Sequence, residues 1–249
     1  RIMFWKKEKP KLKFYCQLPE VQETYPIVPS KEVSFSWQKE VVKNYKAQNA
    51  VEGTKRAITS SVKCPGIVPS MRMGYIVKSW FDLTIITEKD DPKKFQYFFN
   101  DKMYRYLEER NFHKARLISW FSSEDKAHTV PLAENDLQEL IKISTPWWVD
   151  VPKGYKLLIT PITYGDRTEF SSVHGVLDHS AQWPINVILK WHKRPGETFI
   201  PAGTPLCQLI LVKDDEVPYE ILPWTEKNLN ADLYNDFMNH HSFTPKPKK

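Results

Sequence analysis

The sequence has little glycine and very few cysteines for its length. Its 249 residues include 8 glycines, 19 prolines and 3 cysteines. Proline is poorly tolerated inside helices and central strands, so this composition favours short strands joined by extended connections. Cys16, Cys64 and Cys207 are odd in number and widely spaced. They form neither a CxxC pair nor a disulfide framework, and they indicate a reducing compartment.

Long apolar runs are also missing. The longest of them, such as Leu206–Val212, are far shorter than the roughly 20 residues that cross a bilayer. The segment Arg1–Lys7 has no extended apolar region and no small-residue cleavage site. We therefore expect a chain that is neither secreted nor transmembrane.

Positive charge is concentrated at the two ends of the chain. The net charge is +6, and much of the surplus comes from Lys6, Lys7, Lys9, Lys11, Lys13, Lys246, Lys248 and Lys249. Basic tails of this kind can contact phosphates, but most are simply solvated ends. No basic stripe interleaved with aromatic residues occurs in the middle of the chain, so we expect nucleic acid contact only through the tails.

Short runs rich in β-branched and aromatic residues dominate the final third of the sequence. We expect strands over Val173–Leu177, Ile185–Trp191, Thr198–Ile200 and Leu206–Val212. Such runs, separated by turns with glycine and proline, are typical of an all-β barrel or jelly roll. Upstream, strands are expected over Leu12–Leu18, Val33–Trp37, Gly74–Ile86, Phe95–Phe99, Leu117–Phe121 and Ile141–Val151, the last broken by Pro146.

Helical patterns are few. Asp101–Arg110 predicts a short helix capped by Asp101, and Glu134–Leu140 predicts one or two helical turns. The spacing of Leu229, Leu233 and Phe237 predicts a short amphipathic helix near the carboxyl terminus. We accordingly divide the chain into an extended amino-terminal arm (1–60), a β core (61–217) and an extension with that helix and a basic tail (218–249).

Several motifs of the core resemble the dUTP pyrophosphatases and their dCTP deaminase relatives. These motifs are Pro152-Lys-Gly-Tyr155, Gly175-Val-Leu-Asp178 and the closing Cys207-Gln-Leu209 strand. The resemblance covers about a quarter of the chain. It implies a mainly β fold with a β-clip or jelly-roll core, extended here by the amino-terminal arm and the short carboxyl-terminal helix. It also implies that Asp178 occupies the position of the carboxylate that orients the attacking water.

The parts that perform chemistry in that family are mostly absent. Pro161-Ile-Thr163 stands where the family has a phosphate-gripping Pro-Arg-Ser segment. His179–Trp183 contains no tyrosine to discriminate the sugar, and no glycine follows Val212 to form a carboxyl-terminal lid. A carboxylate without donors for a triphosphate cannot run the reaction alone, so the sequence favours a retained fold with lost catalysis.

The whole chain also resembles an uncharacterised family of tailed phages and some bacteria. Cys64-Pro-Gly, the Gly74–Leu83 strand, Ser144-Thr-Pro-Trp and the Pro201–Gln208 segment carry this resemblance. This resemblance suggests a phage origin. Together with the proline-rich arm, the two appended ends and the missing catalytic groups, it leads us to expect a non-enzymatic assembly protein, a virion component of head, neck or baseplate, located in the virion or the host cytoplasm. We expect it to bind other virion proteins and itself, as a trimer by analogy. The expected contacts are Trp5, Phe14, Leu229, Leu233 and Phe237, and no cofactor is expected.

Two enzymatic hypotheses stand beside this one. The first is a nucleotide pyrophosphatase with Asp178 as general base. The second is a metal-dependent cupin or oxygenase that uses His179, His192 and Asp178 as ligands. Trp147, Trp148, Trp183 and Trp191 also suggest a stacking platform for a sugar or base, although core packing is the commoner role of tryptophan.

Overall fold

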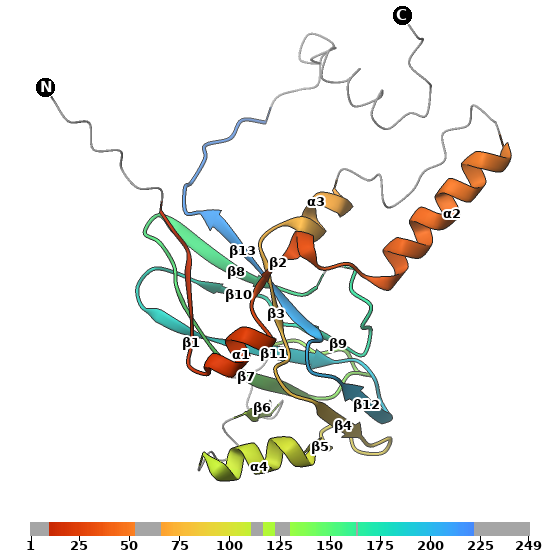
Figure 1. The fold of residues 1–249 in the computed structure, drawn as a ribbon, viewed down its shortest axis with the longest axis vertical. Helices are drawn as coiled ribbons and strands as arrows, with labels where there is room; N and C mark the ends of the chain where they lie inside the picture. The colour runs from red at the N-terminus through yellow and green to blue at the C-terminus, as the bar shows by residue number, and fades with distance from the viewer. Residues whose placement is uncertain (1–9, 53–65, 111–116, 123–129, 163, 222–249) are drawn as a thin grey trace, which may run out of the picture. The chain divides into compact units, whose positions relative to one another are not determined.

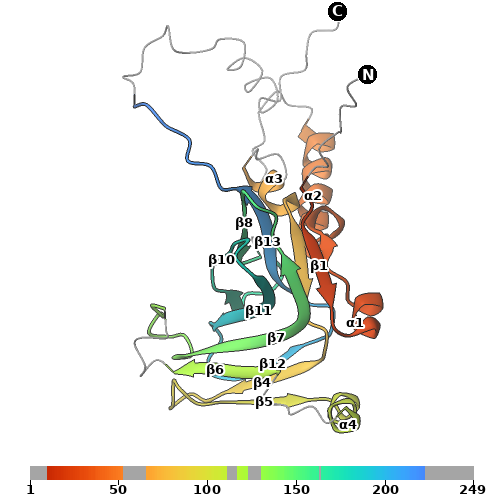
Figure 2. The same ribbon diagram turned by 90° about the vertical axis from the view of Figure 1, so that its left-hand side faces the viewer.

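The computed structural model describes residues 10–52, 66–110, 117–122, 130–162 and 164–221, and strands predominate among them (Figures 1 and 2). All strand pairs are antiparallel, which confirms the predicted mainly β fold. The chain divides into two compact units. Unit 1 is Arg1–Val33 with Met73–Asp214, and unit 2 is Ser34–Arg72 with Asp215–Lys249. Within the described ranges, no helix is both long and apolar enough to span a membrane.

The first sheet of unit 1 is organised by two long strands. It contains β1 (Lys13–Cys16), β6 (Ile118–Ser122), β7 (Glu139–Asp150), β9 (Phe170–Ser172) and β11 (Gln182–Trp191). β11 pairs with β7 on one side and β9 on the other, while β1 and β6 pair with opposite ends of β7. Buried and half-buried residues alternate along most of β11, as expected for a strand with one face on the core.

The second sheet closes the core around the carboxyl-terminal strand. Its strands, in spatial order, are β10 (Gly175–Leu177), β8 (Tyr155–Thr160), β13 (Pro205–Lys213), β3 (Tyr75–Lys78) and β2 (Val28–Pro29). Strands from both ends of the sequence therefore lie side by side. The predicted strand over Leu206–Val212 is confirmed as part of β13, which is buried from Leu206 to Leu209 and half-buried from Ile210 to Val212.

The third sheet is a hairpin with one added strand. β4 (Leu83–Thr87) lies between β5 (Phe95–Phe99) and β12 (Gly196–Ile200). The strand predicted over Phe95–Phe99 is confirmed as β5, which forms an antiparallel hairpin with β4. The prediction of a single strand over Gly74–Ile86 is wrong, because residues 79–82 interrupt it and place β3 and β4 in different sheets. Ser79 fixes this break: its N–H donates to Thr204 O at 2.8 Å, and its carbonyl accepts the Gly203 N–H at 2.7 Å.

A β-bulge interrupts the ladder between β7 and β11. The register shifts between Pro184 and Asn186, opposite the β7 segment that contains Pro146. Proline has no N–H to give to a ladder, so it is accommodated here rather than in a regular pair. The Thr145 hydroxyl donates to Ile185 O at 2.6 Å and accepts the Trp147 N–H at 3.2 Å, which repairs the ladder locally. β7 therefore continues through the break predicted at Pro146.

Helix α4 (Asp101–Glu109) confirms the predicted helix, with a different cap. Asn100, not Asp101, accepts the Met103 N–H on its side chain at 2.8 Å. Among its described residues, unit 1 also contains α1 (Pro19–Thr24) and the 3-10 turn η1 (Ser30–Glu32). The helical turns predicted over 134–140 are wrong: Asp136 Oδ2 accepts the Ala133 N–H in a turn, and β7 begins at Glu139.

Unit 2 contains α2 (Ser36–Glu52) and α3 (Ile67–Arg72) among its described residues. α2 replaces the strand predicted over Val33–Trp37, because Gln38 Oε1 accepts the Phe35 N–H at 3.2 Å and fixes the first helical turn. The predicted helix over 229–237 lies outside the described residues. The division into arm, core and extension stays a prediction, although β1 and β2 of the predicted arm pair with strands of unit 1.

Candidate functional site

Asp178 lies in the turn between β10 and β11 and bonds to its own turn. Its Oδ1 accepts the Ser180 N–H at 2.9 Å and also the Ser180 hydroxyl, and its carbonyl accepts the Trp183 Nε1–H at 3.1 Å. The hydroxyl of Ser180 and then its N–H hold the pKa of Asp178 below its ordinary value. A carboxylate held in this way stabilises a turn, and it is a weak general base because its proton affinity is low.

His192 does not join Asp178 and His179 in a ligand set. Its Nδ1 lies 3.0 Å from Asp136 Oδ1, and its Nε2 lies 2.7 Å from Ser171 Oγ. Across the described residues, no group of three or more His, Cys, Asp and Glu side chains is arranged to hold a metal ion. The hypothesis of a metal site made by His179, His192 and Asp178 gains no support from this geometry, since both ring nitrogens of His192 lie against other partners.

The sequence interpretation missed both partners of His192. Ser171 lies on β9, and Asp136 lies in the turn before β7. The three residues come together because β9 pairs with the end of β11, while the Leu137 N–H donates to Trp191 O at 2.9 Å. No motif marks them, because pairing between strands supplies the proximity.

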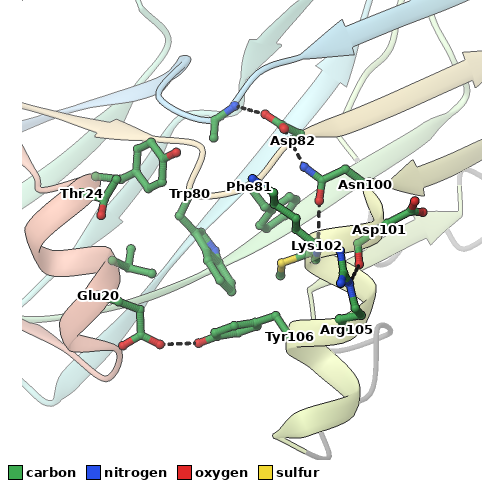
Figure 3. Close-up of a pocket in the computed structure, with 14 residues that line it drawn as sticks. Glu20, Thr24, Trp80, Phe81, Asp82, Asn100, Asp101, Lys102, Arg105 and Tyr106 are labelled. Carbon is green, nitrogen blue, oxygen red and sulfur yellow. Dashed lines mark hydrogen bonds between the residues drawn. The ribbon is translucent and has the colours of Figure 1, made fainter.

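A cavity of about 670 Å³ lies between α1, α4 and the segment that joins β3 to β4, and its lining residues are drawn in Figure 3. Trp80, Phe81 and Tyr106 form its aromatic wall. Its polar groups are largely used within the protein. Asp82 accepts the Ala202 N–H and the Asn100 amide, both at 2.7 Å. The Asp82 carboxylate is therefore held by groups of the protein, and it fixes the start of α4 beside the segment that joins β3 to β4.

Glu20 and Tyr106 link α1 to α4 across this cavity (Figure 3). The Tyr106 hydroxyl donates to Glu20 Oε1 at 2.9 Å, and Arg110 forms a 2.8 Å ion pair with the same oxygen. The Arg110 guanidinium also lies 4.7 Å from the centre of the Tyr106 ring. A second cavity, of about 390 Å³, lies beside Trp80, Tyr106 and Arg110 and is bordered by Pro146 and Trp148.

The contact between Tyr106 and Glu20 predicts a fall in stability at high pH. Burial, and then the hydrogen bond to Glu20, raise the pKa of Tyr106 from 10.0 to about 12. The folded state thus holds this proton more tightly, so its contribution to stability is complete below about pH 10 and is lost between about pH 10 and about pH 12. In Tyr106→Phe we expect a shallower fall across this window, measured by urea unfolding at several pH values.

The difference in pH dependence between Tyr106→Phe and the wild type reports the titration of the Tyr106 hydroxyl alone. Burial also raises the pKa of Cys207, from 9.0 to about 12, but both proteins share this thiol, so it cancels in the difference. The variant should in addition lose about 0.5–1.5 kcal/mol below pH 10 with its hydrogen bond. Identical slopes above pH 10 in the two proteins would show that Tyr106 has no linkage to folding.

The third sheet has an apolar edge strand in the described part of the chain. β5 has the sequence Phe-Gln-Tyr-Phe-Phe, and in the described part of the chain it pairs only with β4. Phe98 is 44% exposed on the outer face, and Phe199 of β12, 52% exposed, lies in the same cross-strand row through Thr84. An apolar edge of this kind is a template for pairing with another strand.

The residues predicted to bind partners fall in different places. Trp5, Leu229, Leu233 and Phe237 lie outside the described residues. Phe14 lies in β1, where its ring packs edge-on against Tyr75 with 5.4 Å between ring centres. Its predicted role in partner binding stays a prediction.

Comparisons with known proteins give matches among solved structures alone. No family model matches the chain, and no curated protein matches it. The dUTPase of phage phi11 of S. aureus is 14% identical, with 69% of this chain and 96% of that chain covered and a TM-score of 0.33. The EIAV dUTPase is 16% identical, with 45% and 80% covered and a TM-score of 0.29. The Staphylococcus bacteriophage 80alpha dUTPase is 15% identical, with 44% and 97% covered and a TM-score of 0.26.

Proposed function

We propose that this chain acts by assembly, as a virion component of a tailed phage, and that it binds a second copy of itself through the edge of β5. The virion role rests on the sequence resemblance to a phage family. The observation that carries self-binding is the β5 edge, which is apolar and, in the part of the chain that the structure describes, open on one side. Exposed edges of this composition lead to pairing between chains unless charge or proline blocks them.

The sequence of β5 is complementary to itself. In an antiparallel pair related by a two-fold axis at Tyr97, Phe95 lies opposite Phe99 of the second copy, and Phe98 lies opposite Gln96. A two-fold contact requires such reciprocity, because each residue meets its counterpart twice. Cross-strand aromatic pairs each contribute roughly 0.2–1 kcal/mol, so the edge gains stability as well as hydrogen bonds.

Charges next to β5 fit the same register. The axis at Tyr97 brings Lys93 of one copy toward Asp101 of the other, at both ends of the pair. Opposite charges at the rim favour this register over shifted ones, because a shift separates the charges and breaks the aromatic pairs. The row formed by Phe98, Thr84 and Phe199 then continues across the axis as a shared outer surface.

The test is the mass of the purified chain in solution. We expect light scattering after gel filtration to give twice 29.3 kDa for the wild type. Phe98→Lys should give the monomer mass and weaken association by about 30-fold or more, the effect of losing a central contact worth about 2 kcal/mol. Val176→Lys is the matched control: Val176 is 57% exposed on β10, the edge of another sheet, and its variant should remain dimeric.

Several outcomes contradict the proposal in separate ways. Self-association through the β5 edge is excluded if the wild type is a monomer at every concentration. It is also excluded if Val176→Lys dissociates the dimer as much as Phe98→Lys does. Three times 29.3 kDa excludes the two-fold contact and favours the trimer predicted by analogy. The absence of this chain from intact phage particles, measured by mass spectrometry, excludes the virion role and leaves self-association standing.

A further inference from the structure

Three side chains of unit 1 form a continuous chain of hydrogen bonds at the end of β11. Ser171 Oγ lies 2.7 Å from His192 Nε2, and His192 Nδ1 lies 3.0 Å from Asp136 Oδ1. The residues come from β9, from the residue after β11 and from the turn before β7. Serine, imidazole and carboxylate in this order are the arrangement that activates a hydroxyl nucleophile.

The chemistry of these groups determines the direction of each hydrogen bond. An ionised carboxylate only accepts, so the Nδ1 of His192 carries the proton and donates it to Asp136. In the neutral ring Nε2 is then an acceptor, and the Ser171 hydroxyl donates to it. The imidazole is thus held in the tautomer that can take the serine proton, which is the function of the carboxylate in a triad.

Asp136 is well placed to hold the ring. It is 8% exposed, and its second oxygen accepts the Ala133 N–H at 3.3 Å. The Arg194 guanidinium donates to its carbonyl at 3.3 Å, which fixes the turn from the other side. The His192 side chain, by contrast, is 35% exposed, so a small molecule can approach the outer end of the chain.

We propose that Ser171 is a reactive nucleophile that cleaves activated acyl esters, with His192 as general base and Asp136 as positioning residue. Ser171 Oγ bonds to the ester carbonyl carbon while its proton passes to His192 Nε2. The bond from that carbon to the ester alkoxy oxygen breaks, and the alcohol leaves with the proton from His192. Water then attacks the acyl group on Ser171, gives a proton to His192 and releases the carboxylic acid, and the proton returns to Ser171.

The surroundings limit which substrates react. Ser171 lies in the middle of β9, opposite Lys190, so its own backbone is part of the ladder. The N–H groups of His192 and Lys193 both donate to Glu169 O, at 2.7 and 3.3 Å, and are not directed at an incoming carbonyl. Loss of one oxyanion donor costs about 10²–10³ in rate, so the site suits esters with good leaving groups and not peptide bonds.

The test uses the full chain and a fluorophosphonate probe, which bonds to an activated serine and releases fluoride. Intact and peptide mass spectrometry should show one adduct, on Ser171. Ser171→Ala should abolish it, and His192→Gln should slow its formation by about 100-fold or more, the usual contribution of a general base. Asp136→Asn should slow it too, since the amide no longer selects the Nδ1–H tautomer. Hydrolysis of p-nitrophenyl acetate should follow the same order.

Ser180→Ala is the matched control. Ser180 is exposed and donates to the Asp178 carboxylate, but it has no histidine as its hydrogen-bond partner in the described structure, so its variant should label like the wild type. Thermal unfolding distinguishes a purely structural role for these residues. If the three side chains only hold the turn before β7, their substitutions lower the unfolding temperature and the wild type forms no adduct. An unlabelled wild type, or equal labelling of Ser180 and Ser171, overturns the proposal. None of these outcomes depends on self-association.

Discussion

Gly74→Ala is expected to lower the free energy of unfolding of unit 1 by more than about 4 kcal/mol, at the upper end of single-substitution effects. An alanine Cβ at this position would lie 1.8 Å from Leu209 O and 2.9 Å from Leu209 C, both backbone atoms of β13. Neither strand can move away without breaking the pairing of β3 with β13. The backbone at Gly74 also has φ +68°, a conformation that costs an L-residue about 1–2 kcal/mol.

Gly154→Ala separates these two causes. Gly154 has φ +81°, but an added Cβ meets nothing within 4 Å. This control should therefore lose only the conformational cost, about 1–2 kcal/mol. Urea unfolding followed by circular dichroism measures both variants. Equal losses would mean that the close approach of Gly74 to Leu209 does not limit stability.

Trp191→Ala is the second substitution with a large expected effect. Trp191 is fully buried, and its ring stacks on Phe170 with 5.7 Å between centres and 15° between planes. Removing a buried tryptophan costs about 3–5 kcal/mol, because apolar contacts are lost and a cavity remains. The buried Nε1 has no hydrogen-bond partner in the described structure, so its removal relieves a small penalty and favours the lower part of this range.

Trp120→Ala is the matched control for Trp191. Trp120 lies on β6, is 54% exposed and contacts Phe95 edge-on at 5.9 Å. Its loss should cost less, about 1–2 kcal/mol, since roughly half of its surface stays in water in the folded state. The expected result is a clear difference in urea midpoint between the two variants. Similar midpoints would show that the core does not close around Trp191.

Local sequence patterns predicted the strands and helices that are determined by neighbouring residues in the chain. β5 and most of β11 follow from β-branched and aromatic residues with suitable spacing, and α4 follows from one apolar face with a polar cap. The break between β3 and β4 could not be predicted in this way. It depends on Ser79 bonding to Gly203 and Thr204, far along the chain, and nothing in the local run of apolar residues indicates it.

In the candidate sites, too, residue types could be read from the sequence but their spatial partners could not. The sequence drew attention to Asp178 and His192 because their residue types are chemically capable, but the partners of His192 depend on strand pairing. Ser171 lies 21 residues before His192 and Asp136 lies 56 before it. The open edge of β5 was equally hidden, since the order of strands in a sheet, and not the composition of a strand, decides which one lies at the edge.

The pairing of β1 with β7 has a consequence for biosynthesis. Phe14 lies opposite Val149, and β3 likewise lies beside β13, so the early strands find their neighbours only after most of the chain has been made. At about 5–20 residues per second, the ribosome needs on the order of ten seconds to bridge that interval. During this time β1 has left the ribosome but its pairing partner β7 has not yet been made. Folding of unit 1 must therefore finish after translation of β13. Nascent chains of this protein are therefore expected to depend on holding chaperones.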